Sequence, residues 1–263
     1  MNRYSRTAAV VGGVVAGVLV VPGASAVARD GGLWGAATIA PGREGIVEVA
    51  GVPQGAEDVT LTLTAPRGTR VTGVPLDASG YRGSVAADGR SAAYTVSGGA
   101  SGQDGASGQN GVSGQDGVSG QDGVLPFVLA VPGDAAPGTR LRDCSLRLTD
   151  ARGVPRAVGR CSVTVGLASP TLTSPLSGVP LGARPEVSGT AHPGAQVTVR
   201  DKDDQEACAT TAASDGTWSC TPGTGLPAGA NRLQAVAALN GVSAMSEQID
   251  IVVAAREAGA GRQ

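Results

Sequence analysis

The sequence predicts an all-β protein with two β-sandwich domains in tandem after a cleaved signal peptide. The chain has 263 residues with 42 glycines and 16 prolines, and it is rich in valine, threonine and alanine. This composition is typical of short strands joined by tight turns, and no window has a long helical period of apolar residues. Four cysteines form two local pairs, each flanking a run of turn residues. They predict two disulfide bonds and an oxidising, extracellular compartment.

Residues 1–26 have the features of a secretory signal peptide. Arg3 and Arg6 give a charged start, an apolar run extends from Ala8 to Val21, and Ala24-Ser25-Ala26 is a small-residue cleavage site. Cleavage is expected after residue 26 or 28. The apolar run is shorter than the ~20 residues of a transmembrane helix, so we expect secretion without membrane insertion. The tail, residues 254–263, is expected to be disordered and to carry no motif for covalent attachment to a cell wall.

The first predicted domain, a β-sandwich, covers residues 29–166. Alternating apolar and polar positions predict strands at Val59–Leu63, Ala93–Val96, Phe127–Val131 and Cys161–Val165. Cys144 and Cys161 lie symmetrically about a turn at Arg152-Gly153. This symmetry predicts a disulfide-linked hairpin in which Leu146 faces Gly159 and Leu148 faces Ala157.

A glycine-rich segment interrupts this domain at residues 99–124. Every third residue from Gly99 to Gly123 is glycine, as in collagen. The triplets contain no proline, and an extended helix of this length would hold its two ends about 75 Å apart. Strands of one sandwich cannot be separated that far, so we expect a flexible polar insert. Two alternatives stay open: a division of the region into two weak pieces, and a collagen-like trimer.

The second predicted domain covers residues 169–253 and reads as a sandwich of short strands. The clearest strands are expected at Glu186–Thr190, Gln196–Arg200, Ala207–Ala212, Thr217–Thr221, Asn231–Ala238 and Gln248–Val253. Cys208 and Cys220 are symmetric about Ser214, which predicts a second hairpin with Cys208 opposite Cys220 and Thr210 opposite Trp218. Trp218 is therefore expected in the core. Four cysteines allow three connectivities, and we expect the two local bonds because the others would cross between domains.

The second domain resembles a known family in two segments. Residues 188–199 read SGTAHPGAQVTV and residues 215–220 read DGTWSC. They are similar to the repeat of bacterial immunoglobulin-like (Big) domains of the secreted, actinobacterial type. The resemblance implies an immunoglobulin-like Greek-key sandwich that serves as a spacer or an adhesive module, and it transfers no ligand. The stretch from Ala40 to Gly68 resembles other secreted sandwich repeats, over a shorter length.

No set of residues in the sequence predicts catalysis. The single histidine, His192, lies in an expected turn, and nucleophile-elbow, phosphate-loop and paired-histidine metal motifs are missing from the sequence. Four acidic residues after Arg200 could in principle hold calcium, but they lack the glycine and the distal glutamate of an EF-hand loop. These four residues are Asp201, Asp203, Asp204 and Glu206. We expect a solvated hairpin tip there, and no metal, no cofactor and no enzyme activity.

The sequence therefore predicts a secreted, non-enzymatic structural or interaction module of adhesion type, extracellular or loosely associated with a bacterial cell wall. The expected partner is a protein or a cell-wall glycan, and the expected oligomeric state is a monomer. Nucleic acid is a poor partner, because acidic side chains (22) outnumber basic ones (20) and no basic cluster occurs. A polysaccharide-binding module is the main alternative, although the aromatic residues that stack on sugars are few. Trp34 is the aromatic side chain most expected to be exposed.

Overall fold

The computed structural model describes residues 32–53, 57–98 and 123–255, and in these residues the chain is built of β-strands without helices. An N-terminal strand group comprises β1 (Trp34–Ile39), β2 (Glu44–Ala50), β3 (Val59–Thr64), β4 (Arg70–Gly73), β5 (Tyr81–Val85), β6 (Ser91–Val96), β7 (Leu125–Ala130), β8 (Arg140–Leu141), β9 (Ser145–Asp150) and β10 (Pro155–Val165). A C-terminal strand group comprises β11 (Thr171–Ser174), β12 (Pro180–Leu181), β13 (Val187–Thr190), β14 (Gln196–Arg200), β15 (Glu206–Thr211), β16 (Thr217–Cys220), β17 (Gly229–Leu239), β18 (Val242–Met245) and β19 (Ile249–Val253). The prediction of an all-β protein is confirmed.

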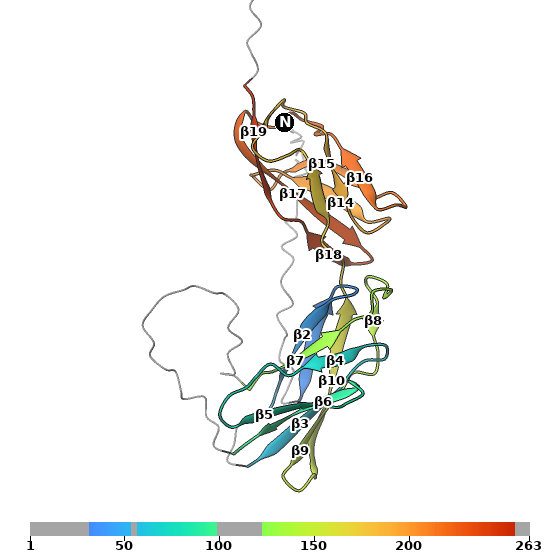
Figure 1. Ribbon diagram of the computed structural model, residues 1–263, viewed down its shortest axis with the longest axis vertical. Coiled ribbons are helices and arrows are strands. Elements are labelled where there is room, and N and C mark those ends of the chain that lie inside the picture. The colour runs from blue at the N-terminus through green and yellow to red at the C-terminus, as the bar shows by residue number, and fades with distance from the viewer. Residues whose placement is uncertain (1–31, 54–56, 99–122, 256–263) are drawn as a thin grey trace, which may run out of the picture.

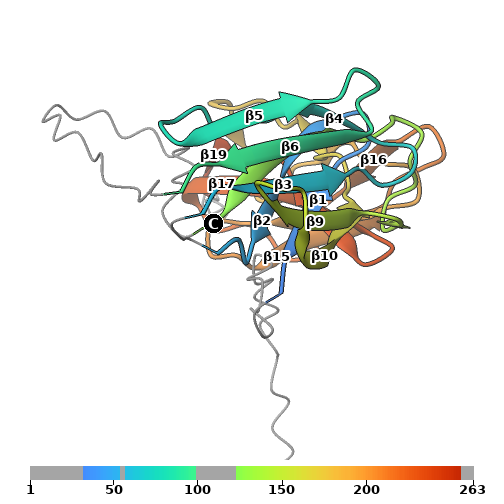
Figure 2. The same cartoon turned by 90° about the horizontal axis from the view of Figure 1, so that it is seen from below.

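The long strand β10 connects two layers in the N-terminal group. Its first part, residues 155–160, pairs with β9, and its second part, residues 160–165, pairs in parallel with β1. The layer beyond β9 continues with β3, β6 and β5, which lie side by side in Figure 2. The layer beyond β1 continues with β2, β7 and β4. One hydrogen-bonded sheet therefore folds over itself at β10 and encloses a core.

The core of the N-terminal group lies between these two layers. Tyr94 of β6 and Phe127 of β7 are fully buried, and their rings meet edge to face at a centroid distance of 5.1 Å. The hydroxyl of Tyr94 accepts a hydrogen bond from the backbone N–H of Leu76 (2.9 Å). Burial raises the pKa of Tyr94, and this hydrogen bond offsets part of the effect. The tyrosine is thus a neutral core residue whose single polar atom is satisfied.

Two sheets enclose a second, separate core in the C-terminal group (Figure 1). One sheet has the order β11-β13-β16, and the other has the order β12-β19-β17-β14-β15, with β18 beside β17. Alternate residues of β17 point inward, among them Leu233, Ala235 and Ala237, and none of these three is exposed. The strand predicted at Gln196–Arg200 is confirmed residue for residue, and β11, β12 and β18 are present in addition to the predicted strands.

A very short connection joins the two groups. Val165 is buried in the first core and Leu167 in the second, so a single residue, Gly166, separates the two buried side chains. The N–H of Gly166 donates to the carbonyl of Ile39 (2.8 Å). A second contact comes from the β17–β18 turn, where the side-chain amide of Asn240 donates to the carbonyl of Pro137 (3.1 Å). The connection is therefore fixed by one hydrogen bond to the N-terminal group and flanked by a second that links the two groups directly.

Three predictions fall largely outside the described residues. The signal peptide, residues 1–26, lies wholly outside them, as do residues 99–122 of the glycine-rich segment and residues 256–263 of the tail. These predictions stay predictions. Within the described ranges, the chain forms no helix with the length and apolar character needed to cross a membrane.

Candidate functional site

The first cysteine pair closes a hairpin, as the sequence predicts. Cys144 and Cys161 are disulfide-bonded with their Cα atoms 5.1 Å apart. In the β9–β10 register, Leu146 pairs with Gly159 and Leu148 with Ala157, so the predicted register is confirmed. Both cysteines are buried in the N-terminal core. They act in the structure as a cross-link and not as a reactive pair.

The second cysteine pair is bonded as predicted, but the predicted hairpin is wrong. Cys208 and Cys220 are joined with their Cα atoms 6.0 Å apart. However, β15 pairs with β14 and β16 pairs with β13, so the two cysteines lie in different sheets. The chain between them forms an arch that carries it from one sheet to the other. Symmetry about Ser214 cannot distinguish an arch from a hairpin, because both bring the two cysteines opposite each other.

Trp218 keeps the predicted burial but has a different partner from the predicted one. It is 4% exposed and belongs to the C-terminal core. In the β13–β16 register it pairs with Gly189, and Thr210 pairs with Val197 of β14 instead. The core position was predicted from the hairpin register, which is wrong, and it holds because the arch also turns Trp218 toward the core; the actual partner depends on long-range pairing.

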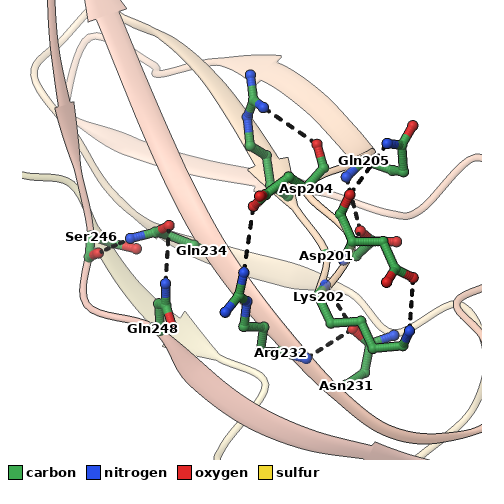
Figure 3. A network of polar contacts seen from close by, with 11 residues as sticks. Asp201, Lys202, Asp204, Gln205, Asn231, Arg232, Gln234, Ser246 and Gln248 are labelled. Carbon is green, nitrogen blue, oxygen red and sulfur yellow. Dashed lines mark hydrogen bonds and ion pairs between the residues drawn. The ribbon is translucent and has the colours of Figure 1, made fainter. Parts of the chain in front are cut away.

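The acidic residues after Arg200 form the tip of the β14–β15 hairpin (Figure 3). Asp201 organises the turn, because its carboxylate accepts hydrogen bonds from the backbone N–H groups of Asp203 and Gln205, each at 2.9 Å. Such bonds from a carboxylate to its own loop are the usual way in which aspartate stabilises a turn. The carboxylate of Asp201 is therefore occupied by hydrogen bonds to the backbone of its own loop.

The other acidic side chains of this tip face basic neighbours or the neighbouring strand. Asp203 pairs with Lys202 (2.7 Å) and Asp204 with Arg232 of β17 (3.5 Å). Glu206 begins β15 opposite Arg200. The ion pairs are exposed, and exposed pairs contribute about 0–1 kcal/mol to stability. In the described part of the chain, no group of three or more histidine, cysteine, aspartate or glutamate side chains is arranged to hold a metal ion.

The same polar region continues along β17 (Figure 3). Asn231 is 5% exposed, and its side-chain oxygen accepts hydrogen bonds from the backbone N–H groups of Lys202 (3.1 Å) and Arg232 (2.8 Å). Further along, the amide of Gln234 donates to the carbonyl of Ser246 (3.0 Å). These contacts tie the hairpin tip and the β18–β19 connection to β17. Their role is to hold the C-terminal group together.

His192 lies in the β13–β14 turn, as predicted. It is partly exposed, and its Nδ1 atom is 3.0 Å from the carbonyl oxygen of Pro193. Its own carbonyl accepts a hydrogen bond from the N–H of Ala195 (3.0 Å), which closes the turn. These contacts give the histidine a local structural role.

The candidate functional site is a hollow on the outer face of the N-terminal group, which we call the Trp34 hollow. It has a volume of about 380 Å³. It spans β2, β1, β10 and β8, which lie side by side in this order. Its lining residues are Trp34, Ala36, Ala37, Thr38, Glu48, Ala50, Val124, Arg140, Ser162 and Thr164. The volume lies within the ordinary range of small-molecule sites, ~300–1,000 Å³.

The strand registers place the side chains of the Trp34 hollow. Ala36 pairs with Ser162 on one side and with Glu48 on the other. The small side chains of Ala36 and Ser162 therefore form the floor, and Glu48 stands on one wall. Trp34 lies at one end of β1 and Thr38 lies about 13 Å further along, at ~3.3 Å per residue. Next to Thr38 are Thr164 and then Arg140. The hollow therefore has an aromatic end, a floor of small side chains, and charged residues on opposite walls.

Glu48 and Arg140 carry the two charges of the Trp34 hollow. Three strand spacings of ~4.8 Å separate their strands, so the walls are about 14 Å apart. That distance exceeds the ~8–10 Å over which salt screens exposed charges, so the two groups do not neutralise each other. No ion pair links either group to another residue of the described ranges. Both are available as hydrogen-bonding groups.

Sequence reasoning singled out one residue of this site and missed the others. Trp34 was expected to be exposed, and it is partly exposed in the hollow. Glu48, Arg140, Ser162 and Thr164 were not predicted. A signal exists for two of them, since Ser162 and Thr164 alternate with the buried residues of β10 and must face outward. Their position beside β1 depends on a parallel pairing between residues more than a hundred positions apart, which no local pattern reveals.

Comparisons with known proteins give no family for this chain. No family model matches the sequence, and no curated protein matches it. The resemblance to bacterial immunoglobulin-like domains therefore stays a prediction.

Solved structures match at low similarity. The BSP domain of a biofilm-associated protein matches with 14% identity and a TM-score of 0.29, covering 86% of this chain and 30% of that one. The FN1–FN3 domains of chicken CNTN1 match with 12% identity and a TM-score of 0.31, covering 85% and 66%. The C-terminal domain of the Streptococcus agalactiae AgI/II polypeptide BspA matches with 11% identity and a TM-score of 0.24, covering 83% and 95%. At these TM-scores the likeness supports no statement about function or partner.

Proposed function

We propose that this protein is a secreted, non-enzymatic interaction module of adhesion type at the exterior or cell wall of a bacterium. In this proposal, residues 29–166 and 169–253 are two tandem immunoglobulin-like domains. The observation that supports it most is that each strand group carries one disulfide bond packed against its core, and these two bonds use all four cysteines of the chain. Such bonds persist in oxidising compartments outside the cytosol. The open, charged Trp34 hollow supplies a surface on which a partner can be bound.

Secretion followed by retention at the envelope tests this proposal. The full chain is expressed with its N-terminal segment in a bacterial host, beside a matched variant that lacks residues 1–26. The secreted protein is expected to begin at Val27 or Arg29, to contain no free thiol, and to bind the producing organism's envelope fraction. The truncated variant is expected to stay in the cytosol. Reduced cysteines in the exported protein, or no retention on any envelope fraction, would contradict the proposal.

The proposed oligomeric state is a monomer. The alternative is a collagen-like trimer, which would require residues 99–123 to associate between chains. Sedimentation equilibrium of the mature protein distinguishes the two, because the trimer has three times the mass of the monomer.

A further inference from the structure

We propose that the Trp34 hollow binds a neutral glycan chain. This inference rests on the proposed function, because it names the ligand class of an interaction module whose ligand is otherwise open. It is carried by three observations: the composition of the hollow, the pairing of its strands, and the placement of its two charges.

The composition of the hollow fits sugar rings. An indole presents a flat apolar face, on which the C–H face of a sugar can pack, together with an N–H donor. Around it, Glu48 offers acceptors, Arg140 offers donors, and Ser162 and Thr164 offer hydroxyls that both donate and accept. Few, convergent polar groups around an apolar surface are typical of a ligand site. The length of about 13 Å along β1 leaves room for more than one sugar ring.

The strand pairing disfavours an extended peptide as the ligand. A peptide gains most of its affinity on a sheet by adding a strand to an open edge. The central strands of the hollow have no open edge, since β1 lies between β10 and β2, and β2 lies between β1 and β7. Only β8 at the wall has a single partner among the described strands, and its two residues are too few to align an added strand. The floor of alanine, serine and threonine also offers no deep apolar pocket for a peptide side chain. Recognition must therefore come from side chains alone, which suits the many hydroxyl groups of a glycan.

The placement of the charges favours an uncharged ligand. An anionic chain that crosses the hollow would meet Glu48 on one wall, and a cationic chain would meet Arg140 on the other. A neutral chain can form charge-assisted hydrogen bonds with both. A hollow of similar volume, about 400 Å³, at the β9–β10 tip differs in this respect. There Arg156 already forms ion pairs with Asp150 (3.0 Å) and Glu57 (3.4 Å), so three of the charged side chains that line it are paired with one another.

Tryptophan fluorescence provides a direct test. The chain has two tryptophans, and Trp218 is buried in the other strand group, so a ligand in the hollow is expected to perturb Trp34 alone. The full mature protein, with both disulfides formed, is titrated with cellotetraose, chitotetraose and maltotetraose as neutral probes. Tetragalacturonate serves as the anionic probe and the peptide Val-Thr-Val-Thr as the peptide probe. At least one neutral probe is expected to produce a saturable change, larger than that of the other two classes.

Variants assign the binding to the hollow. Trp34→Ala, Glu48→Gln and Ser162→Val are each expected to lower the affinity for the bound neutral probe, measured by calorimetry, and Trp34→Ala by about tenfold or more. Arg147→Ala is the matched control, because Arg147 is an exposed residue of β9 in the opposite layer. This variant is expected to bind the neutral probe with unchanged affinity. Glu48→Gln and Ser162→Val keep the test decisive if Trp34→Ala does not fold.

Three results would overturn the inference: no saturable response to any neutral probe, tighter binding of the anionic or peptide probe, or unchanged affinity in all three hollow variants. Its failure can be distinguished from failure of the proposed function. If the protein and its Trp34→Ala variant are equally retained on the envelope fraction, the interaction module stands and the hollow is not its site.

Discussion

At the scale of single residues, Gly189 of β13 shows how closely the sheet of β11, β13 and β16 packs on the C-terminal core. A side chain at this position would meet the carbonyl oxygen of Thr171 and, at 2.8 Å, the Cζ2 atom of Trp218. Neither atom can move easily, because one belongs to the backbone and the other to a buried ring. Glycine is therefore needed here for close approach and not for an unusual backbone conformation.

We expect Gly189→Ala to lower the free energy of unfolding by about 1–3 kcal/mol, the usual cost of forcing extra volume into a packed core. Urea unfolding in a Trp34→Phe background, followed by the fluorescence of Trp218, measures the change. The matched control is Gly182→Ala, since a Cβ at Gly182 meets no atom within 4 Å. Equal stability of the two variants would show that the contact of Gly189 with Trp218 is not tight.

At the scale of elements, the strands were more predictable than their partners. Alternation of apolar and polar residues identified Gln196–Arg200 correctly, because Val197 and Val199 point inward between polar neighbours. The same reasoning found the second part of β10 at Cys161–Val165, whereas the first part, from Pro155 to Arg160, was predicted from the symmetry of the cysteine pair and not from alternation. There the exposed Val158 breaks the alternation, being 70% exposed on the outer face. A local pattern reports which side is buried and contains no information on which strand lies alongside.

The two cysteine pairs show the same difference between locating a strand and identifying its partner. The β9–β10 hairpin could be predicted with its register, since its partner strand is the next one in sequence. The second pair has the same symmetry, yet it links β15 and β16 across two sheets. What decided between hairpin and arch was the pairing of β14 with β15 and of β13 with β16, which is set by the whole core.

We expect the double variant Cys208→Ala/Cys220→Ala to lose about 2–4 kcal/mol of unfolding free energy. Amide hydrogen exchange is expected to accelerate at β16, because β16 pairs with β13 alone among the described strands, and the disulfide is its covalent tie to the other sheet. The comparison variant is Cys144→Ala/Cys161→Ala. In that variant β10 keeps neighbours on both sides and is expected to stay protected. Unchanged exchange at β16 would argue against the role of the inter-sheet bond.

At the scale of the whole molecule, the connection between the two strand groups determines how freely they can move. Val165 and Leu167 are buried in different cores, and the segment around them is hydrogen-bonded on the side of the N-terminal group. Gly138 shows that the β17–β18 turn also packs closely on the N-terminal group, since a side chain at this position would meet the Cβ atom of Asn240 at 2.6 Å. The sequence predicted a boundary between residues 166 and 169, but not that both of its ends are anchored.

We expect insertion of Gly-Ser-Gly-Ser between Gly166 and Leu167 to free the two groups from each other. Nitrogen-15 relaxation is expected to show separate and faster tumbling of each group, because the insertion removes the constraint of two buried anchors one residue apart. The same insertion in the exposed turn between Arg152 and Gly153 is the control and is expected to leave tumbling unchanged. Identical tumbling of both variants would indicate that the anchors do not restrict the groups.

The parallel pairing of β1 with β10 has a mechanical consequence. β1 is the first strand of the N-terminal group and β10 is the last, and they run side by side over six residue pairs, from Trp34 with Arg160 to Ile39 with Val165. Tension between the two ends of this group therefore pulls the strands along each other in shear. Their hydrogen bonds then resist the force together and not one after another, as they would if the strands were peeled apart. A strand group with this order therefore resists a pulling force between its two ends with all the β1–β10 hydrogen bonds at once.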